Sequence, residues 1–155
     1  MKKVIYIGGD HAGFNLKEKI KTWLIREGNS VKDIGPFRYD KHDDYPDYTI
    51  PLAESVSKHR DSYGIVIAGS GIGETIAANK VNGIRAVLYH SHSPKLITTS
   101  KIHDNANILC LGSRFLNEKE IKSAIKLWLR TSFTGEKRHK RRLGKITKYE
   151  NKRKV

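Results

Sequence analysis

Residues 65–80 read IVIAGSGIGETIAANK, and this stretch decides the fold. The apolar residues 65–68 predict the end of a buried strand, the glycines at 69, 71 and 73 predict a turn, and residues 74–80 predict the start of a helix. Such a loop forms an anion cradle, because free backbone N–H groups point into one space. Glu74 would repel a phosphate there. We therefore expect the loop to stabilise a developing oxyanion while Glu74 moves a proton.

On both sides of this stretch, short apolar runs alternate with helical patterns. This alternation predicts a mostly parallel sheet with helices on both faces. In such sheets ligands bind outside the carboxyl ends of the strands, where loops 8–13, 69–74 and 112–114 would lie. The predicted strands are residues 3–7, 30–34, 63–68, 84–89 and 107–111, and the predicted helices are 14–27, a helix capped by Thr49 and running to about 58, 74–80, part of 93–101 and 118–130.

The composition of the 155-residue chain, 37% hydrophobic and 30% charged, suits one soluble globular domain. No run approaches the ~20 apolar residues that cross a bilayer, so we expect no membrane partner. The N-terminal MKKVIYIGGDH turns polar after four apolar residues, which predicts a first strand rather than a signal peptide. Cys110 is the one cysteine and lies in an apolar run, so we expect inert core, no internal disulfide and a cytoplasmic location.

Much of the net charge of +14 lies near the C-terminus. Residues 136–155 carry ten Lys or Arg and two Glu, a net charge of +8. We predict a helix in the first half of residues 133–155 and a loose end. Arg138 and Arg142, four residues apart, would share one helical face and clamp a phosphate, the alternatives being an RNA contact or solvated charge. Tyr149 is the lone aromatic residue near this run, which argues against nucleic acid.

Further polar residues are candidates for chemistry. Asp10 and His11 follow the first strand, either as a helix-capping aspartate beside a surface histidine or as binders of sugar hydroxyls and phosphate. His103 precedes the fifth strand, and we expect it at the same edge of the sheet. The field of the helix dipole would keep the pKa of Glu74 low enough for an ionised base at neutral pH. No H-E-x-x-H or paired C-x-x-C pattern is present, so we predict no metal.

The glycine loop has two other interpretations. The glycines alone also fit a plain turn between a strand and a helix. A dinucleotide fingerprint fits poorly, because the loop follows the third strand, has the spacing G-x-G-x-G and lacks an acid ~20 residues further on.

Taken together, the motifs resemble those of the type B ribose-5-phosphate isomerases, in the family that also holds the galactose-6-phosphate isomerase subunits. The resemblance implies a Rossmann-like α/β/α sandwich with a five-stranded parallel sheet and a C-terminal helical extension. It also implies dimers or tetramers with active sites shared between subunits, and no metal or cofactor. We assign residues 1–146 to the isomerase domain and 147–155 to a basic tail. The matching segments are GGDHAGFNLKEKI (8–20), DDYPDY (43–48), GIVIAGSGIGETIAANKVNGIRAVL (64–88), ANILCLGSR (106–114) after His103, and FTGEKRHKRRLGKI (133–146).

The activity implied by the resemblance is the aldose–ketose isomerisation of ribose 5-phosphate and ribulose 5-phosphate through an enediolate, a step of the pentose phosphate pathway. Many members use a cysteine just before the first glycine as the base, where this chain has Ala68, and another branch uses a glutamate at the position of Glu74. Ser70 would assist Glu74, and His103 matches the histidine that opens the sugar ring. The implied substrate-binding residues are Asp10, His11, Gly69, Gly71, Gly73, Asp104, Asn105, Arg114, Arg138, His139 and Arg142.

One departure and two alternatives remain. The family usually reads His-Asn-Asp where this chain has His103-Asp104-Asn105, and an ionised Asp104 cannot donate a hydrogen bond to an oxyanion. Asn105 would have to take that role. The alternatives are isomerisation of a six-carbon sugar phosphate, such as allose 6-phosphate, and a non-catalytic protein that binds sugar phosphates or nucleic acid.

Overall fold

The structure, a computed structural model, describes residues 3–152. Five parallel strands form one sheet in the order β2-β1-β3-β5-β4, which confirms the predicted α/β class and the five-stranded parallel sheet. The elements in chain order are β1 (Val4–Gly9), α1 (Phe14–Arg26), β2 (Ser30–Gly35), α2 (Pro46–Lys58), β3 (Ser62–Ala68), α3 (Ile72–Ala78), β4 (Ala86–Tyr89), α4 (Pro94–Ile102), β5 (Ile108–Gly112), α5 (Glu118–Arg130) and α6 (Lys137–Lys152).

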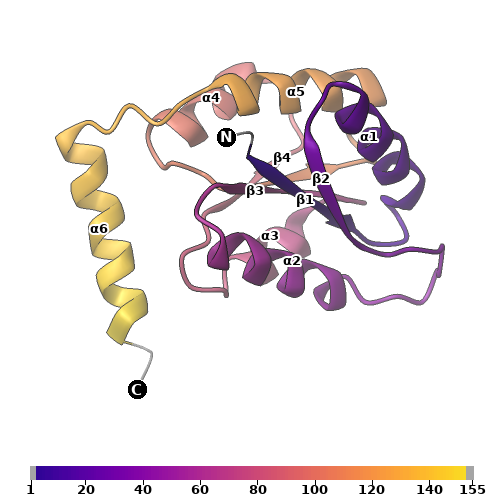
Figure 1. Cartoon of the computed structure of the whole chain (residues 1–155), viewed down its shortest axis with the longest axis horizontal. Helices are drawn as coiled ribbons and strands as arrows, with labels where there is room; N and C mark the ends of the chain where they lie inside the picture. Colours follow the sequence, from indigo (N-terminus) through magenta and orange to yellow (C-terminus); the bar gives the residue numbers. More distant parts are fainter. Residues whose placement is uncertain (1–2, 153–155) are drawn as a thin grey trace.

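Helices cover both faces of the sheet, with α1, α4 and α5 on one side and α2 and α3 on the other (Figure 1). Because side chains of a strand alternate between faces, Ile65 and Ile67 of β3 enter the core under α1 and α5, whereas Val66 enters the core under α2. Both cores are fully apolar at their centres. The sheet is therefore buried on both faces, as the continuous apolar runs predict.

Two predicted helix boundaries differ from the structure. Helix α2 begins at Pro46, so Thr49 lies inside the helix and is buried instead of capping it. Proline suits the first turn of a helix, because its fixed φ is helical and its missing N–H has no partner to lose there. Helix α6 runs without a break to Lys152, well beyond the predicted first half. The predicted boundary at residue 147 falls within this helix, and the final residues lie outside the described part.

Helix α6 stands apart from the sheet and from the helices that cover its two faces, and an extended segment joins it to α5 (Figure 1). Its C-terminal end is tied to its own chain, where the Glu150 carboxylate accepts the Gly83 N–H at 3.1 Å. Within residues 3–152, no helix has both the length and the apolar character that a bilayer crossing requires.

Candidate active site

Three loops meet at the carboxyl edge of the sheet, as expected from the sequence. The Ser113 N–H donates to the Ala68 carbonyl at 2.7 Å, and the Arg114 N–H donates to the Gly69 carbonyl at 3.0 Å. The Ser113 hydroxyl donates to the carbonyl of Ala12 at 3.2 Å. These bonds join the loops that follow β1, β3 and β5 into one surface.

The glycine loop is shaped by its neighbours. Gly71, the residue before α3, has a φ of 77°, a left-handed conformation that favours glycine. A Cβ atom at Gly73 would lie 2.6 Å from Cζ of Tyr45, so the Tyr45 ring packs directly on the loop. The Ser70 hydroxyl accepts the Ile72 N–H at 3.3 Å. Its predicted hydrogen bond to Glu74 stays a prediction.

Glu74 lies in the first turn of α3 with only 4% of its surface exposed, beside the buried carboxyl group of Asp10. Burial raises the pKa of the Glu74 carboxyl, and the adjacent Asp10 and Asp43 raise it further, although a hydrogen bond from its own N–H acts in the opposite direction. The expectation that the helix field lowers this pKa was therefore wrong, and the ionisation of Glu74 at neutral pH stays a prediction. Burial and the neighbouring carboxylates raise the pKa of Glu74 more than the field of the helix N-terminus lowers it.

Asp10 makes the hydrogen bond of a turn aspartate, and its role in binding sugar hydroxyls stays a prediction. Its carboxylate accepts the Gly13 N–H at 3.1 Å, as a turn aspartate does, and it also contacts Glu74. Next to it, Nδ1 of His11 lies 2.6 Å from Oδ1 of Asp43. Sequence reasoning did not single out Asp43, because 32 residues separate it from His11. The DDYPDY motif that contains it was the one available signal.

The guanidinium group of Arg114 lies over Gly69, since a Cβ atom there would be 3.0 Å from Cζ of Arg114. Arg114 is exposed and faces the same side of the site as His11, whose pKa it lowers through charge repulsion, though less than Asp43 raises it. The carboxyl edge therefore brings together the glycines, Glu74, Asp10, His11 and Arg114.

His103 lies at the opposite edge of the sheet. It ends α4, and the loop that follows leads into the start of β5, where the Asn107 carbonyl accepts the N–H of Gly64 near the start of β3. The expectation that His103 shares an edge with the glycine loop was wrong for a single chain. A residue that precedes a parallel strand lies at its amino edge, whereas residues that follow strands lie at the carboxyl edge.

The predicted residues of α6 lie with His103. The rings of His103 and His139 stack with centroids 4.4 Å apart, and His139 is 1% exposed with neither ring nitrogen hydrogen-bonded to the described residues. Arg138 is exposed and pairs with Glu136 at 3.0 Å, and Arg142 is also exposed. The predicted residues therefore form two groups at opposite edges of the sheet.

The His103-Asp104-Asn105 segment has the backbone of a helix end. Asn105 has a φ of 47°, a left-handed conformation that asparagine tolerates better than most residues, and its carbonyl accepts Nε of Arg85 at 2.9 Å. Asp104 is exposed. That Asn105 takes over the role of the asparagine usual in the family stays a prediction.

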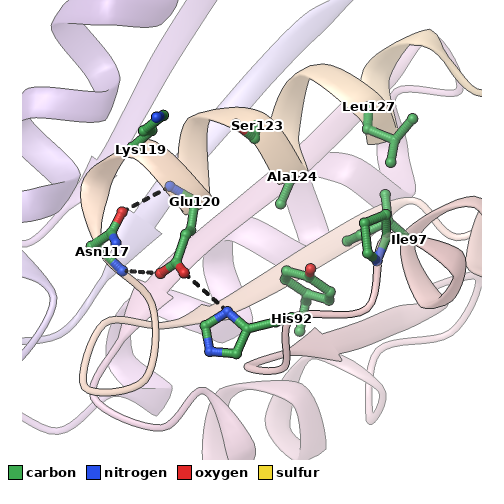
Figure 2. A pocket seen from close by; sticks show the side chains of 10 residues that line it. His92, Ile97, Asn117, Lys119, Glu120, Ser123, Ala124 and Leu127 are labelled. Atoms are coloured by element: carbon green, nitrogen blue, oxygen red, sulfur yellow. Dashed lines mark hydrogen bonds and ion pairs between the residues drawn. The ribbon is translucent and has the colours of Figure 1, made fainter.

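The cavity in Figure 2 has a volume of about 460 Å³ and lies between α4 and α5, and neither Glu74 nor Asp10 lines it. Nδ1 of His92 and Oε1 of Glu120 pair at 2.9 Å at its mouth. None of the predicted site residues lines this cavity.

Among residues 3–152, no three or more His, Cys, Asp or Glu side chains are grouped as metal ligands, and metal-free chemistry stays a prediction.

Comparison with known proteins gives consistent relatives. A family model described as Ribose/Galactose Isomerase matches residues 5–146. A Mycoplasma genitalium protein named probable ribose-5-phosphate isomerase B is 42% identical over 147 residues, covering 94% of this chain and 95% of the relative. The ribose-5-phosphate isomerase B of Mycolicibacterium paratuberculosis is 38% identical over 146 residues, covering 94% and 91%.

Solved structures agree with these relatives. The crystal structure of the Mycoplasma genitalium enzyme with bound ribulose-5-phosphate matches with a TM-score of 0.90 and 42% identity over 96% of each chain. The structure from Clostridium thermocellum matches with a TM-score of 0.89 and 40% identity, over 96% of this chain and 98% of the other. Sequence, motif order and fold lead to one conclusion: this chain belongs to the ribose/galactose isomerase family.

Proposed function

We propose that the protein interconverts ribose 5-phosphate and ribulose 5-phosphate, with Glu74 as the base. The observation that carries the proposal is a buried glutamate under a glycine loop at the carboxyl edge of the sheet, in a chain 42% identical to an isomerase solved with ribulose-5-phosphate. Burial and nearby carboxylates raise the pKa of Glu74 above its ordinary value, which suits a group that must both take and return a proton.

In the proposed mechanism, ionised Glu74 removes the proton from C2 of the open-chain aldose. The electron pair of the C–H bond forms the C1–C2 double bond, and the carbonyl oxygen becomes the enediolate oxyanion. The N–H groups around Gly69, Gly71 and Gly73 stabilise this oxyanion, each donor contributing about 3 kcal/mol. A proton then passes from the C2 hydroxyl to the oxygen on C1, and the C2 oxygen becomes the carbonyl of the ketose. The electron pair of the C1–C2 double bond takes the proton that Glu74 returns to C1. The reaction needs no net oxidant and no added proton.

Two groups of residues at opposite edges point to a second copy of the chain. His103, Arg138, His139 and Arg142 lie too far from Glu74 in one chain to share a substrate with it, because the sheet separates them. Exposed apolar side chains lie on α3, at Ile72 and Ile76, and on α6, at Ile146. We propose a homodimer in which the His103 edge of one copy completes the Glu74 edge of the other.

Mixing two inactive variants tests both proposals. Glu74→Gln and His103→Ala homodimers should each be inactive in a ribose 5-phosphate turnover assay. After unfolding and refolding together, a mixed dimer would hold one site with both substitutions and one with neither. Random pairing in a symmetric dimer should therefore restore about a quarter of the wild-type activity. No recovery in mixed dimers that are shown to form would contradict the shared site.

The length of the preferred sugar is a separate question within the same chemistry. A comparison of kcat/KM for ribose 5-phosphate and allose 6-phosphate decides between a five-carbon and a six-carbon substrate. We expect the five-carbon sugar to be preferred, because the names of the relatives specify ribose-5-phosphate. A higher kcat/KM for allose 6-phosphate would overturn this assignment.

A further inference from the structure

Asp43 holds His11 through two hydrogen bonds. Its Oδ1 atom accepts the backbone N–H of His11 at 3.1 Å and lies 2.6 Å from Nδ1 of the His11 ring. The Asp43 side chain is only 3% exposed, whereas that of His11 is 31% exposed. The buried carboxylate therefore fixes both the backbone and the ring of a histidine that faces the site.

The second oxygen of this carboxylate has no other partner. Oδ2 of Asp43 is buried and makes no hydrogen bond to any described residue. A buried carboxylate is costly unless a positive charge or hydrogen-bond donors compensate it. In this structure that compensation comes from His11, which explains the short 2.6 Å contact.

We propose that Asp43 is a positioning residue that keeps His11 as an imidazolium, with Nδ1 bonded to Asp43 and Nε2 left to bind the phosphate of the sugar substrate. This inference rests on the proposed sugar-phosphate function and adds a residue to it. The hydrogen bond that His11 donates to Asp43 raises the pKa of His11, Asp10 raises it further, and both burial and Arg114 lower it. An imidazolium beside Arg114 offers a dianionic phosphate two cationic donors.

The loop between β2 and α2 brings Asp43 to this position. Its start is anchored where the Asp33 carboxylate accepts the Gly35 N–H at 2.9 Å, and its end is anchored where Tyr45 packs on Gly73. Asp43 lies between these anchors. The same segment therefore covers the glycine loop and orients His11.

Asp43→Asn tests the proposal, because the amide keeps the shape of the carboxylate and removes its charge. Asp40→Asn is the matched control, since Asp40 lies in the same loop, is exposed, and its carboxylate accepts the His42 N–H at 2.9 Å. NMR titration of the His11 imidazole should show a lower pKa in Asp43→Asn and an unchanged pKa in Asp40→Asn. In wild type, the ring should titrate above the ordinary histidine range.

Kinetics provide the second measurement. Asp43→Asn should raise KM for ribose 5-phosphate about 10-fold at neutral pH and change kcat less, because a charge-assisted bond to phosphate weakens while Glu74, on which Asp43 acts only through its charge, stays in place. The rise of KM with pH should begin at lower pH than in wild type. A kcat loss without a KM change, or a wild-type His11 that titrates in the ordinary range, would overturn the proposal.

The two proposals fail in distinguishable ways. If wild-type protein does not turn over ribose 5-phosphate, the proposed function is wrong, whereas the NMR titration still decides whether Asp43 controls His11. If Asp43→Asn does not fold, the titration of wild-type His11, assigned by comparison with His11→Gln, decides alone.

Discussion

Glu74→Gln should lower the turnover rate of the protein and raise the stability of its fold. The glutamine keeps the size of Glu74 and retains an oxygen for its own backbone N–H, but it cannot accept a proton. A positioned general base typically contributes 10²–10⁴-fold, and because Asp10 beside it offers a substitute carboxylate, we expect a loss of about 10³-fold in kcat. This corresponds to about 4 kcal/mol of activation free energy. KM should change little.

The same substitution should stabilise the fold. The pKa of Glu74 is higher in the folded than in the unfolded protein, because the folded site buries it beside Asp10 and Asp43. The ionised group therefore costs stability at pH values above its folded pKa, and this cost disappears at acid pH, where both states are protonated. Relative to wild type, Glu74→Gln should unfold at higher urea concentration at pH 8 and at a similar concentration at pH 4.

The assays are steady-state turnover of ribose 5-phosphate and urea unfolding at the two pH values. Glu54→Gln on α2 is a matched control, because Glu54 is exposed and only pairs with Lys58 at 3.6 Å. It should leave both measurements unchanged. A Glu74→Gln variant with near-normal kcat would refute the assignment of the base, and one that is less stable at pH 8 would refute the argument from burial.

Two further predictions concern the fold beneath the site. Gly13→Ala should destabilise the protein by about 3 kcal/mol or more in urea unfolding, because the new Cβ would lie 1.8 Å from the backbone oxygen of Ile67 and forces the main chain apart. Asp33→Asn should cost about 2 kcal/mol at pH 7, since the fully buried Lys17 loses one of its two carboxylate partners and keeps Glu18 at 2.7 Å. Burial alone would raise the pKa of Asp33, but hydrogen bonds from Lys21 and Lys17 lower it overall, so this loss should shrink as the pH falls through the carboxyl range. A loss for Asp33→Asn that stays constant down to pH 3 would contradict the ion-pair explanation, and a Gly13→Ala protein as stable as wild type would contradict the close packing.

Local sequence patterns were sufficient for the architecture. The apolar run at 65–68 and its counterparts predict buried parallel strands, because such strands need apolar residues on both faces. The rule that ligand loops follow parallel strands also placed Asp10, the glycines and Arg114 together. Each of these inferences depends on residues close in sequence to the end of a strand. The chain itself fixes where such residues lie relative to their strand.

Three features were decided by tertiary structure. The edge occupied by His103 depends on the direction of the sheet, and Glu74 lies at the opposite edge. The raised pKa of Glu74 depends on exclusion of water and on carboxylates contributed by distant segments. The contact of Asp43 with His11 depends on the path of a loop. Electrostatics and loop contacts arise only where separate segments pack together. The sequence therefore predicted candidate residues for the site, but neither their charge states nor their division between two edges of the sheet.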